Sequence, residues 1–308
     1  MGDIVHALPA VSDIIRHVPD AQVDWVAEEA FAALPALHPD VADVIPVALR
    51  RWRKNWFDAG VRAERGNFLR RLRAHRYDAV IDLQGLIKSA LVARRARGPL
   101  HGCGFRSARD PFAALFYGHR HRVVFEQSAV VRMRLLPALS LGYEFSGPPD
   151  FGVRAEPPPG LPARYAAIMP SASRATKLWD EGHWRAVLAR LQVAGCAPLL
   201  FAGNDEERAR AQRLAQGIEG AQALPRMGLA DAAGVLAGAA VVVGLDSGLT
   251  HLAGALGRPT IGIYADYDPA LAPVTGAGFI ACLGGPGKPP SAQEVLAAIG
   301  RALPEAAR

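Results

Sequence analysis

A short segment rich in proline and glycine divides this chain into two halves of similar length. Residues Ser146–Pro162 contain six prolines and three glycines in 17 positions. Proline lacks a backbone donor and glycine favours turns, so this segment cannot continue a helix or a central strand. It therefore predicts a linker between two domains, 1–150 and 151–308, and each is long enough to form its own core.

Apolar runs of strand length alternate with helical periodicity on both sides of this segment. The alternation is typical of βαβ units around parallel sheets, so we predict an α/β fold with two doubly wound domains. The predicted strands cover residues 22–27, 78–82, 165–169, 198–202, 240–244 and 260–264, and the predicted helices cover 61–73, 86–97, 129–141, 182–193, 205–216, 229–237, 248–256 and 292–302.

The first residues lack the buried strand that normally opens a doubly wound domain. Apolar positions between Ile4 and Val18 already recur at helical spacing. We therefore expect the first strand of domain 1–150 to be missing, and the natural protein to begin upstream of Met1. Peptide mapping that found Met1 at the native N-terminus would reject this hypothesis.

Composition excludes several classes of protein. Half of the residues are apolar and 21% are charged, which is typical of a globular protein, and no apolar run approaches the roughly 18 to 20 residues of a membrane span. The three cysteines are odd in number and widely spaced, which argues against a disulfide framework or a zinc cluster. No export signal is readable, so we expect a cytoplasmic protein.

Positive charge is concentrated in one stretch of the first half. The net charge is +6, and ten basic residues between Arg50 and Arg76 face only Asp58 and Glu64. The run Arg50–Phe57 also mixes cations with aromatic side chains. Nucleic acid, an anionic lipid surface and a small acidic ligand each fit such a stretch, and a solvated basic face fits it as well.

The strongest local signal in the second half is an apolar strand that runs directly into a helix at Asp246, Ser247 and Gly248. Free backbone N–H groups and the helix dipole at such a junction bind phosphate, and His251 lies one turn further on. The alternative is that Asp246 or Ser247 only caps the helix.

Two further loops follow predicted strands of the same half. Ser173 and Lys177 lie in the first, where they could bind a diphosphate, although a polar surface loop is the alternative. Asp205 and Glu206 follow the next strand, where a carboxylate could accept from ribose hydroxyls or simply complement the helix dipole. Together the three strand ends predict a nucleotide pocket. In the first half, Asp3 precedes the predicted helix as a general base or as a helix cap.

Four motifs resemble those of one known family. Met1–Pro9, Arg50–Phe57, Tyr77–Ser89 and Leu245–Leu252 are similar, in this order, to motifs of the bacterial lipopolysaccharide heptosyltransferases of glycosyltransferase family 9. The Leu245–Leu252 motif is shared by the wider family, whereas Arg50–Phe57 points to the branch that adds the first heptose. The resemblance covers nearly the whole chain.

This resemblance implies a GT-B glycosyltransferase, with two Rossmann-like domains facing a central cleft. Domain 1–150 would bind the acceptor and domain 151–308 the donor, ADP-L-glycero-β-D-manno-heptose. The acceptor would be Kdo of Kdo2-lipid A at the inner face of the inner membrane, which the enzyme would contact peripherally. The configuration at the anomeric carbon of the heptose would invert. The reaction would need no cofactor or metal ion, and the protein would bind no nucleic acid. A later heptosyltransferase with another acceptor, and a non-catalytic protein that binds nucleotide or RNA, stay open as alternatives.

The resemblance also implies residue roles by matching position. Asp3 would be the catalytic base, and Lys177 would stabilise the leaving ADP. The residues that would hold the donor are Ser173, Lys177, Asp205, Glu206, Met227, Asp246, Ser247, Gly248 and His251. The residues that would hold the acceptor are Arg50, Arg53, Lys54, Arg109 and Arg132.

Overall fold

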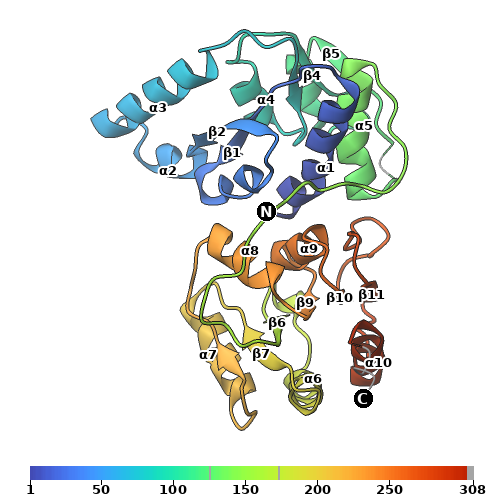
Figure 1. Ribbon diagram of the computed structural model, residues 1–308. Coiled ribbons are helices and arrows are strands. Elements are labelled where there is room, and N and C mark those ends of the chain that lie inside the picture. The colour runs from blue at the N-terminus through green and yellow to red at the C-terminus, as the bar shows by residue number, and fades with distance from the viewer. Residues whose placement is uncertain (125, 173, 304–308) are drawn as a thin grey trace. The chain divides into compact units, whose positions relative to one another are not determined.

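The computed structural model describes residues 1–124, 126–172 and 174–303 (Figure 1). These residues form two compact units. One comprises His6–Gly152, and the other comprises Val153–Arg308 together with Met1–Val5. The sequence predicted a boundary between two independently folding domains at residues 150 and 151. That boundary stays a prediction.

The unit formed by Val153–Arg308 is built on a six-stranded parallel sheet in the order β11-β10-β9-β6-β7-β8. From the centre of the sheet, β6, β7 and β8 follow one another toward one edge. Strands β9, β10 and β11 follow one another toward the opposite edge. The strands are β6 (Tyr165–Met169), β7 (Ala197–Leu200), β8 (Gln222–Ala223), β9 (Val241–Leu245), β10 (Thr260–Tyr264) and β11 (Ile280–Gly284). The order therefore reverses between β6 and β9, which is the doubly wound arrangement.

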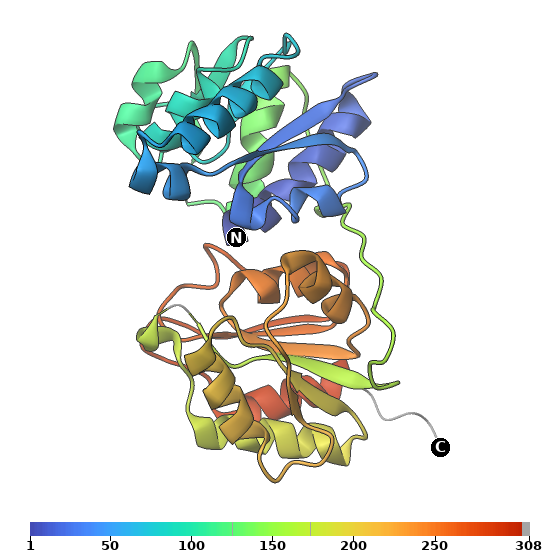
Figure 2. The same ribbon diagram turned by 90° about the vertical axis from the view of Figure 1, so that its left-hand side faces the viewer.

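Helices cover both faces of this sheet (Figure 2), with α8 and α9 on one face and α6, α7 and α10 on the other. They are η5 (Ala175–Lys177), α6 (Glu181–Val193), α7 (Asp205–Ala215), α8 (Leu229–Ala237), α9 (Gly248–Ala255) and α10 (Ala292–Ala302). Side-chain caps fix where several begin: Asp180 accepts from Gly182 N at 2.8 Å before α6, and Ser291 and Glu294 form a capping box at α10.

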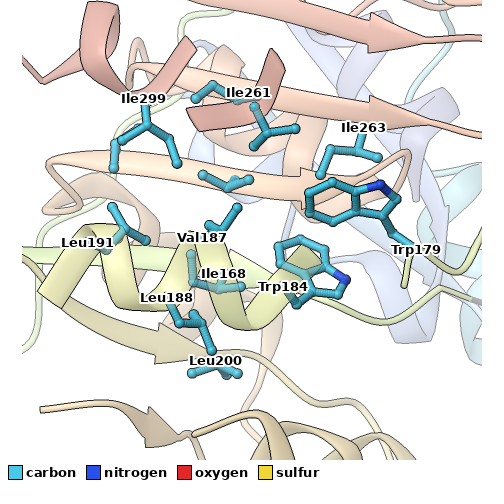
Figure 3. Packing of buried hydrophobic residues seen from close by; sticks show 14 of the residues in the cluster. Ile168, Trp179, Trp184, Val187, Leu188, Leu191, Leu200, Ile261, Ile263 and Ile299 are labelled. Atoms are coloured by element: carbon cyan, nitrogen blue, oxygen red, sulfur yellow. The ribbon is translucent and has the colours of Figure 1, made fainter. Parts of the chain in front are cut away.

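The core of this unit lies between the sheet and the helices α6 and α10 (Figure 3). Every residue of β6, β9 and β10 is buried, as expected for central parallel strands covered on both faces. Trp179 and Trp184 meet edge to face with ring centroids 5.1 Å apart, and Trp184 is fully buried beside Ile168. This packing therefore buries the inner face of α6 against the sheet.

The unit formed by His6–Gly152 contains two parallel sheets among its described residues. One pairs β1 (Val23–Glu28) with β2 (Val41–Val47), and the other has the order β3-β4-β5. The second sheet comprises β3 (Val80–Asp82), β4 (Leu100–Cys103) and β5 (His119–His121). The expected single doubly wound sheet is therefore divided into two parts.

Helices and short 3₁₀ turns connect and cover these strands. They are α1 (Gly2–His17), η1 (Glu29–Phe31), η2 (Pro35–Leu37), α2 (Leu49–Trp52), η3 (Arg53–Asn55), α3 (Ala59–Leu72), α4 (Ile87–Ala93), η4 (Pro111–Phe116) and α5 (Ala129–Leu141). Helix α1 begins at Gly2, so Asp3 lies in its first turn rather than before it. None of the helices that the structure describes has the length and apolar character to cross a bilayer.

A buried ion pair joins α1 to α5. The Arg134 guanidinium donates to Asp13 from Nε at 2.7 Å and from Nη2 at 3.0 Å, and both side chains are almost fully buried. Arg134 also donates to the carbonyl of Gly147 at 3.1 Å and lies over the ring of Phe145. Its charge is therefore satisfied inside the unit.

Candidate functional site

Asp246 at the end of β9 is the centre of a charged cluster. Its Oδ2 accepts a short hydrogen bond from Lys177 Nζ, and its Oδ1 lies 3.1 Å from His251 Nε2. Lys177 Nζ also donates to the main-chain carbonyl of Asp246 at 3.1 Å. The structure therefore brings together three residues that sequence analysis placed on two separate loops.

Burial and hydrogen bonding act in opposite directions on Asp246. Its side chain is only 13% exposed, and this burial by itself favours the neutral carboxyl group. Hydrogen bonds from His251 and Lys177 outweigh burial and lower the pKa of Asp246 from 3.8 to about 2. The carboxylate is consequently ionised at neutral pH and holds the lysine ammonium in place.

The junction after Asp246 combines a helix cap with a half-buried helix start. Ser247 Oγ accepts from Thr250 N at 3.4 Å, so the predicted capping role is realised. Thr250 Oγ1 donates in turn to the carbonyl of Leu245 at 2.6 Å, which ties α9 to the end of β9. A Cβ at Gly248 would overlap the side chain of Met1, which belongs to the same unit. Met1 therefore lies beside the start of α9.

The loop after β6 contributes Lys177 and several hydroxyl groups. Thr176 Oγ1 donates to Asp266 Oδ2 at 2.7 Å, and Arg174 lies 3.4 Å from the same oxygen. Ser171 Oγ is buried and has no hydrogen-bond partner among the described residues. Ser173 lies outside the described residues. Sequence reasoning missed Asp266, because only its pairing with Thr176, 90 residues away, reveals its place in the site.

Asp205 and Glu206 occupy the first turn of α7, after β7, and both are exposed. Asn204 caps this helix by accepting from Glu207 N at 2.9 Å. The cap is therefore a neighbouring residue, which leaves the two carboxylates directed toward solvent rather than engaged in a cap. Met227 is half-buried in the loop that precedes α8.

The register of the sheet brings the three loops to one edge. Met169 of β6 is level with Gly244 of β9, and Ile168 is level with Leu200 of β7. Because the strands are parallel and end together, the loops that carry Lys177, Asp246 and Asp205 leave the same edge of the sheet. This edge provides a cation, a helix start and carboxylates, the groups that a nucleotide diphosphate needs.

The basic run in the other unit has mixed roles. Trp52 is buried and donates from Nε1 to Glu64 at 2.8 Å, and Arg51 pairs with Glu64 and Glu29 at 2.8 and 3.0 Å. These two residues therefore stabilise the α2 region. Arg50, Arg53 and Lys54 are exposed, and no acidic side chain in the described part of the chain pairs with Arg53 or Lys54.

The main chain at Arg109 packs against the turn at Gly85. Asp110 N donates to the carbonyl of Gly85 at 2.9 Å, and Gly85 has a φ of +63° with the Arg109 nitrogen close to where a Cβ would be. Buried Asp82 fixes this turn, because its Oδ1 accepts from Gly85 N at 3.3 Å and its Oδ2 from Tyr117 at 2.7 Å. Arg132 is half-buried on α5.

Metal-ligating groups do not cluster in the parts of the chain that the structure describes. No three histidine, cysteine or acidic side chains in residues 1–124, 126–172 and 174–303 are arranged to hold a metal ion. Positive charge at the candidate site comes instead from Lys177.

Comparison with known protein families identifies the family of this chain. The model of glycosyltransferase family 9 (heptosyltransferase) matches residues 65–293. The chain belongs to glycosyltransferase family 9. Lipopolysaccharide heptosyltransferase 1 of Escherichia coli K12 is 45% identical over 278 residues, covering 88% of this chain and 86% of the relative. The protein of the same name from Pseudomonas aeruginosa PAO1 is 43% identical over 277 residues, covering 88% and 78%.

Solved structures agree with the family assignment. The structure of E. coli heptosyltransferase WaaC with ADP matches with a TM-score of 0.90 and 41% identity. The match covers 98% of the present chain and 97% of the WaaC chain. E. coli heptosyltransferase II, at 21% identity and a TM-score of 0.72, shows the shared fold alone. The predicted α/β GT-B class is confirmed, and so is the resemblance to the heptosyltransferases.

Proposed function

We propose that this protein transfers L-glycero-D-manno-heptose from ADP-heptose to Kdo of Kdo2-lipid A, with inversion at the anomeric carbon. The relatives at 43% to 45% identity carry the name lipopolysaccharide heptosyltransferase 1. A solved structure at 40% identity and a TM-score of 0.86 is WaaC with ADP-2-deoxy-2-fluoro heptose, which supports a donor of this class. The observation that carries the proposal is the Asp246, Lys177 and His251 cluster at the carboxyl edge of the sheet.

The donor binds at this edge. Lys177 and the start of α9 at Gly248 contact the diphosphate, and Ser247 and His251 complete that side. Asp205 or Glu206 accepts from the ribose hydroxyls, and Met227 borders the adenine. Asp246 keeps Lys177 oriented, because the lysine ammonium is bonded to both its carboxylate and its carbonyl. No cofactor is needed in this scheme beyond the donor itself.

The reaction is a single displacement in which Asp3 is the general base. Asp3 takes the proton of an acceptor hydroxyl, whose oxygen forms a bond to the anomeric carbon as the bond from that carbon to ADP breaks. Negative charge that develops on the departing diphosphate is stabilised by Lys177 and by the N–H groups of α9. Asp3 is exposed in the first turn of α1, two residues after Met1 and its contact with Gly248.

Arginine and lysine side chains of the unit His6–Gly152 bind the acceptor. Kdo carries a carboxylate and lipid A carries phosphates, and guanidinium groups bind such anions with paired hydrogen bonds. The proposed residues are Arg50, Arg53, Lys54, Arg109 and Arg132. In this scheme domain 1–150 holds the acceptor and domain 151–308 holds the donor.

The acceptor also determines the cellular location that we propose. Kdo2-lipid A is anchored in the inner membrane, so the enzyme works in the cytoplasm as a peripheral protein on the inner face of that membrane. Basic side chains near an anionic surface contribute about 1 kcal/mol each, and salt screens this attraction. Washing membranes with high salt should therefore release the enzyme, and retention after such a wash would contradict this attachment.

The function is tested by comparing acceptors. The chain is incubated with ADP-heptose and either Kdo2-lipid A or its heptosylated product. Transfer to Kdo2-lipid A alone supports the proposal, whereas transfer only to the heptosylated acceptor assigns a later step of the same pathway. Tight RNA binding without ADP-heptose turnover would reject a transferase role.

A further inference from the structure

Two large apolar side chains stand exposed on η4. Phe112 is 66% exposed and Leu115 is 60% exposed. Residues three apart in a 3₁₀ helix share one side, so both side chains project from the same side of η4. The two residues between them, Ala113 and Ala114, are fully buried. The helix therefore has a clear inner side and an apolar outer side.

A second exposed pair lies on the helix packed against η4. In α4, Ile87 is 36% exposed and Leu91 is 45% exposed, and a spacing of four residues places them on one face. Ala90 of α4 packs with the two buried alanines of η4, so small residues bring the two helices close together. We use the name α4–η4 surface for the exposed side chains of these two packed helices, Ile87, Leu91, Phe112 and Leu115.

The chain around this surface is strongly basic. Residues 83–122 contain eight lysines and arginines and one acidic residue, Asp110. The carboxylate of Asp110 accepts from Phe112 N at 3.1 Å, so this acid serves as the cap of η4. On α4 and just after it, Lys88, Arg94 and Arg95 are all exposed.

We propose that the α4–η4 surface is where this protein docks on an anionic lipid bilayer. The apolar side chains enter the boundary between headgroups and acyl chains, and the neighbouring cations bind lipid phosphates. The inference rests on the proposed function, because an acceptor anchored in a membrane requires the enzyme to reach that membrane.

Chemistry favours a bilayer over RNA at this position. Three of the four exposed side chains are aliphatic, and aliphatic groups neither stack on bases nor bind phosphate, whereas they gain free energy on leaving water for acyl chains. The combination of exposed aliphatic groups and unbalanced positive charge is typical of surfaces that bind anionic membranes.

The more obvious basic stretch, residues 50–76, is less suited to docking because several of its cations already have partners. Arg51 pairs with Glu29 and Glu64. Arg71 pairs with Asp43 at 2.8 Å, and Arg65 lies over the ring of Trp56 at 3.3 Å. These three cations therefore already have partners within the unit, and the exposed Arg50, Arg53 and Lys54 belong to the proposed acceptor site.

The test is cosedimentation of the full chain with vesicles of phosphatidylcholine, with and without phosphatidylglycerol. One variant removes the apolar pair, Phe112→Ser with Leu115→Ser, and one removes cations, Lys88→Gln with Arg94→Gln. Matched controls change similarly exposed side chains elsewhere. Val193→Ser removes an 81% exposed apolar side chain at the end of α6, and Arg62→Gln with Arg70→Gln removes two exposed cations of α3.

The expected result is binding to the anionic vesicles only. The apolar variant should weaken the partition coefficient by about a hundredfold, since two large side chains no longer leave water. The charge variant should weaken it by about fivefold for each cation removed. Both controls should bind like the wild type. Thermal melting, which exposed substitutions should barely move, shows that the variants are folded.

Several results would overturn the inference. These are no binding of the wild type to anionic vesicles, wild-type binding by both test variants, or a larger loss in the α3 control than in the charge variant. If the test variants lost binding to RNA but kept binding to vesicles, the bilayer would also be rejected as the partner of this surface. The vesicle assay uses neither donor nor acceptor, so it stands apart from the heptose-transfer assay. A chain that binds vesicles in this pattern but transfers no heptose removes the proposed function alone.

Discussion

Replacing Asp246 by asparagine tests the charged cluster at the candidate donor site. The substitution keeps the size of the side chain and removes the negative charge that Lys177 and His251 face. In the wild type these contacts lower the pKa of Asp246 from 3.8 to about 2. Each pH unit of such a displacement corresponds to about 1.4 kcal/mol, so ionised Asp246 stabilises the folded chain by about 2 kcal/mol at neutral pH.

The sign of the pH dependence follows from the lowered pKa. The unfolded chain binds the proton more tightly than the folded chain, so the stabilisation is fully present above about pH 4 and is lost as pH falls toward 2. The difference in unfolding free energy between wild type and Asp246→Asn should therefore be about 2 kcal/mol at pH 6 and should shrink across that acidic range.

Amide hydrogen exchange in increasing urea measures this difference within one unit, using peptides from β6 and β9. The matched control is Asp231→Asn, which neutralises an exposed carboxylate in the first turn of α8 and should change stability by only a few tenths of a kcal/mol. Equal stability of wild type and Asp246→Asn at pH 6, or a difference that does not change with pH, would refute the reasoning.

Three further predictions concern separate parts of the molecule. Asp3→Asn should lower kcat for heptose transfer about 10²- to 10⁴-fold while ADP still binds, and near-normal turnover would remove Asp3 from the mechanism. Arg134→Met leaves Asp13 charged and buried, so the unfolding free energy of its unit should fall by about 3 to 5 kcal/mol in the same exchange assay; a loss below 1 kcal/mol would contradict the pairing. Gly85→Ala places a side chain at a φ of +63°, so it should cost about 1 to 2 kcal/mol and raise KM for the acceptor more than KM for ADP-heptose, and unchanged melting temperature and kinetics would disprove that role.

The sequence was most informative where strands are fully buried. The predicted strands at 165–169 and 260–264 match β6 and β10, and the predicted helices at 129–141, 229–237 and 292–302 match α5, α8 and α10. A central parallel strand is apolar on both faces, so its composition alone distinguishes it from its surroundings. Caps such as Ser291 then fix where helices begin.

Strands were missed where their residues are polar or where polar residues interrupt an apolar run. The strand β5 consists of His119, Arg120 and His121, which no apolar pattern marks. Its hydrogen bonds come from pairing with β4, itself only four residues long. Strand β2 was missed as well, although it contains four valine and isoleucine residues, because exposed alanine and aspartate interrupt the run. Pairing between segments, rather than local composition, defines these strands.

Contacts between side chains far apart in the sequence could not be predicted from it. The ion pair between Arg134 and Asp13 joins residues 121 positions apart, so no local pattern could predict it. The phosphate loops after β6 and β9 were predicted from local chemistry, but not that Lys177 bonds to Asp246 across 69 residues. The candidate site was therefore predicted as a set of residues, and its electrostatics emerged only from the structure.

One product analysis tests the central proposal most directly. The chain is given ADP-heptose and Kdo2-lipid A, and the glycolipid formed is examined by mass spectrometry and by NMR of the new anomeric centre. We predict one heptose added to Kdo for each ADP released, with the configuration opposite to that of the donor. Release of ADP without a heptosylated glycolipid, or a product that retains the donor configuration, would contradict direct displacement by the acceptor hydroxyl.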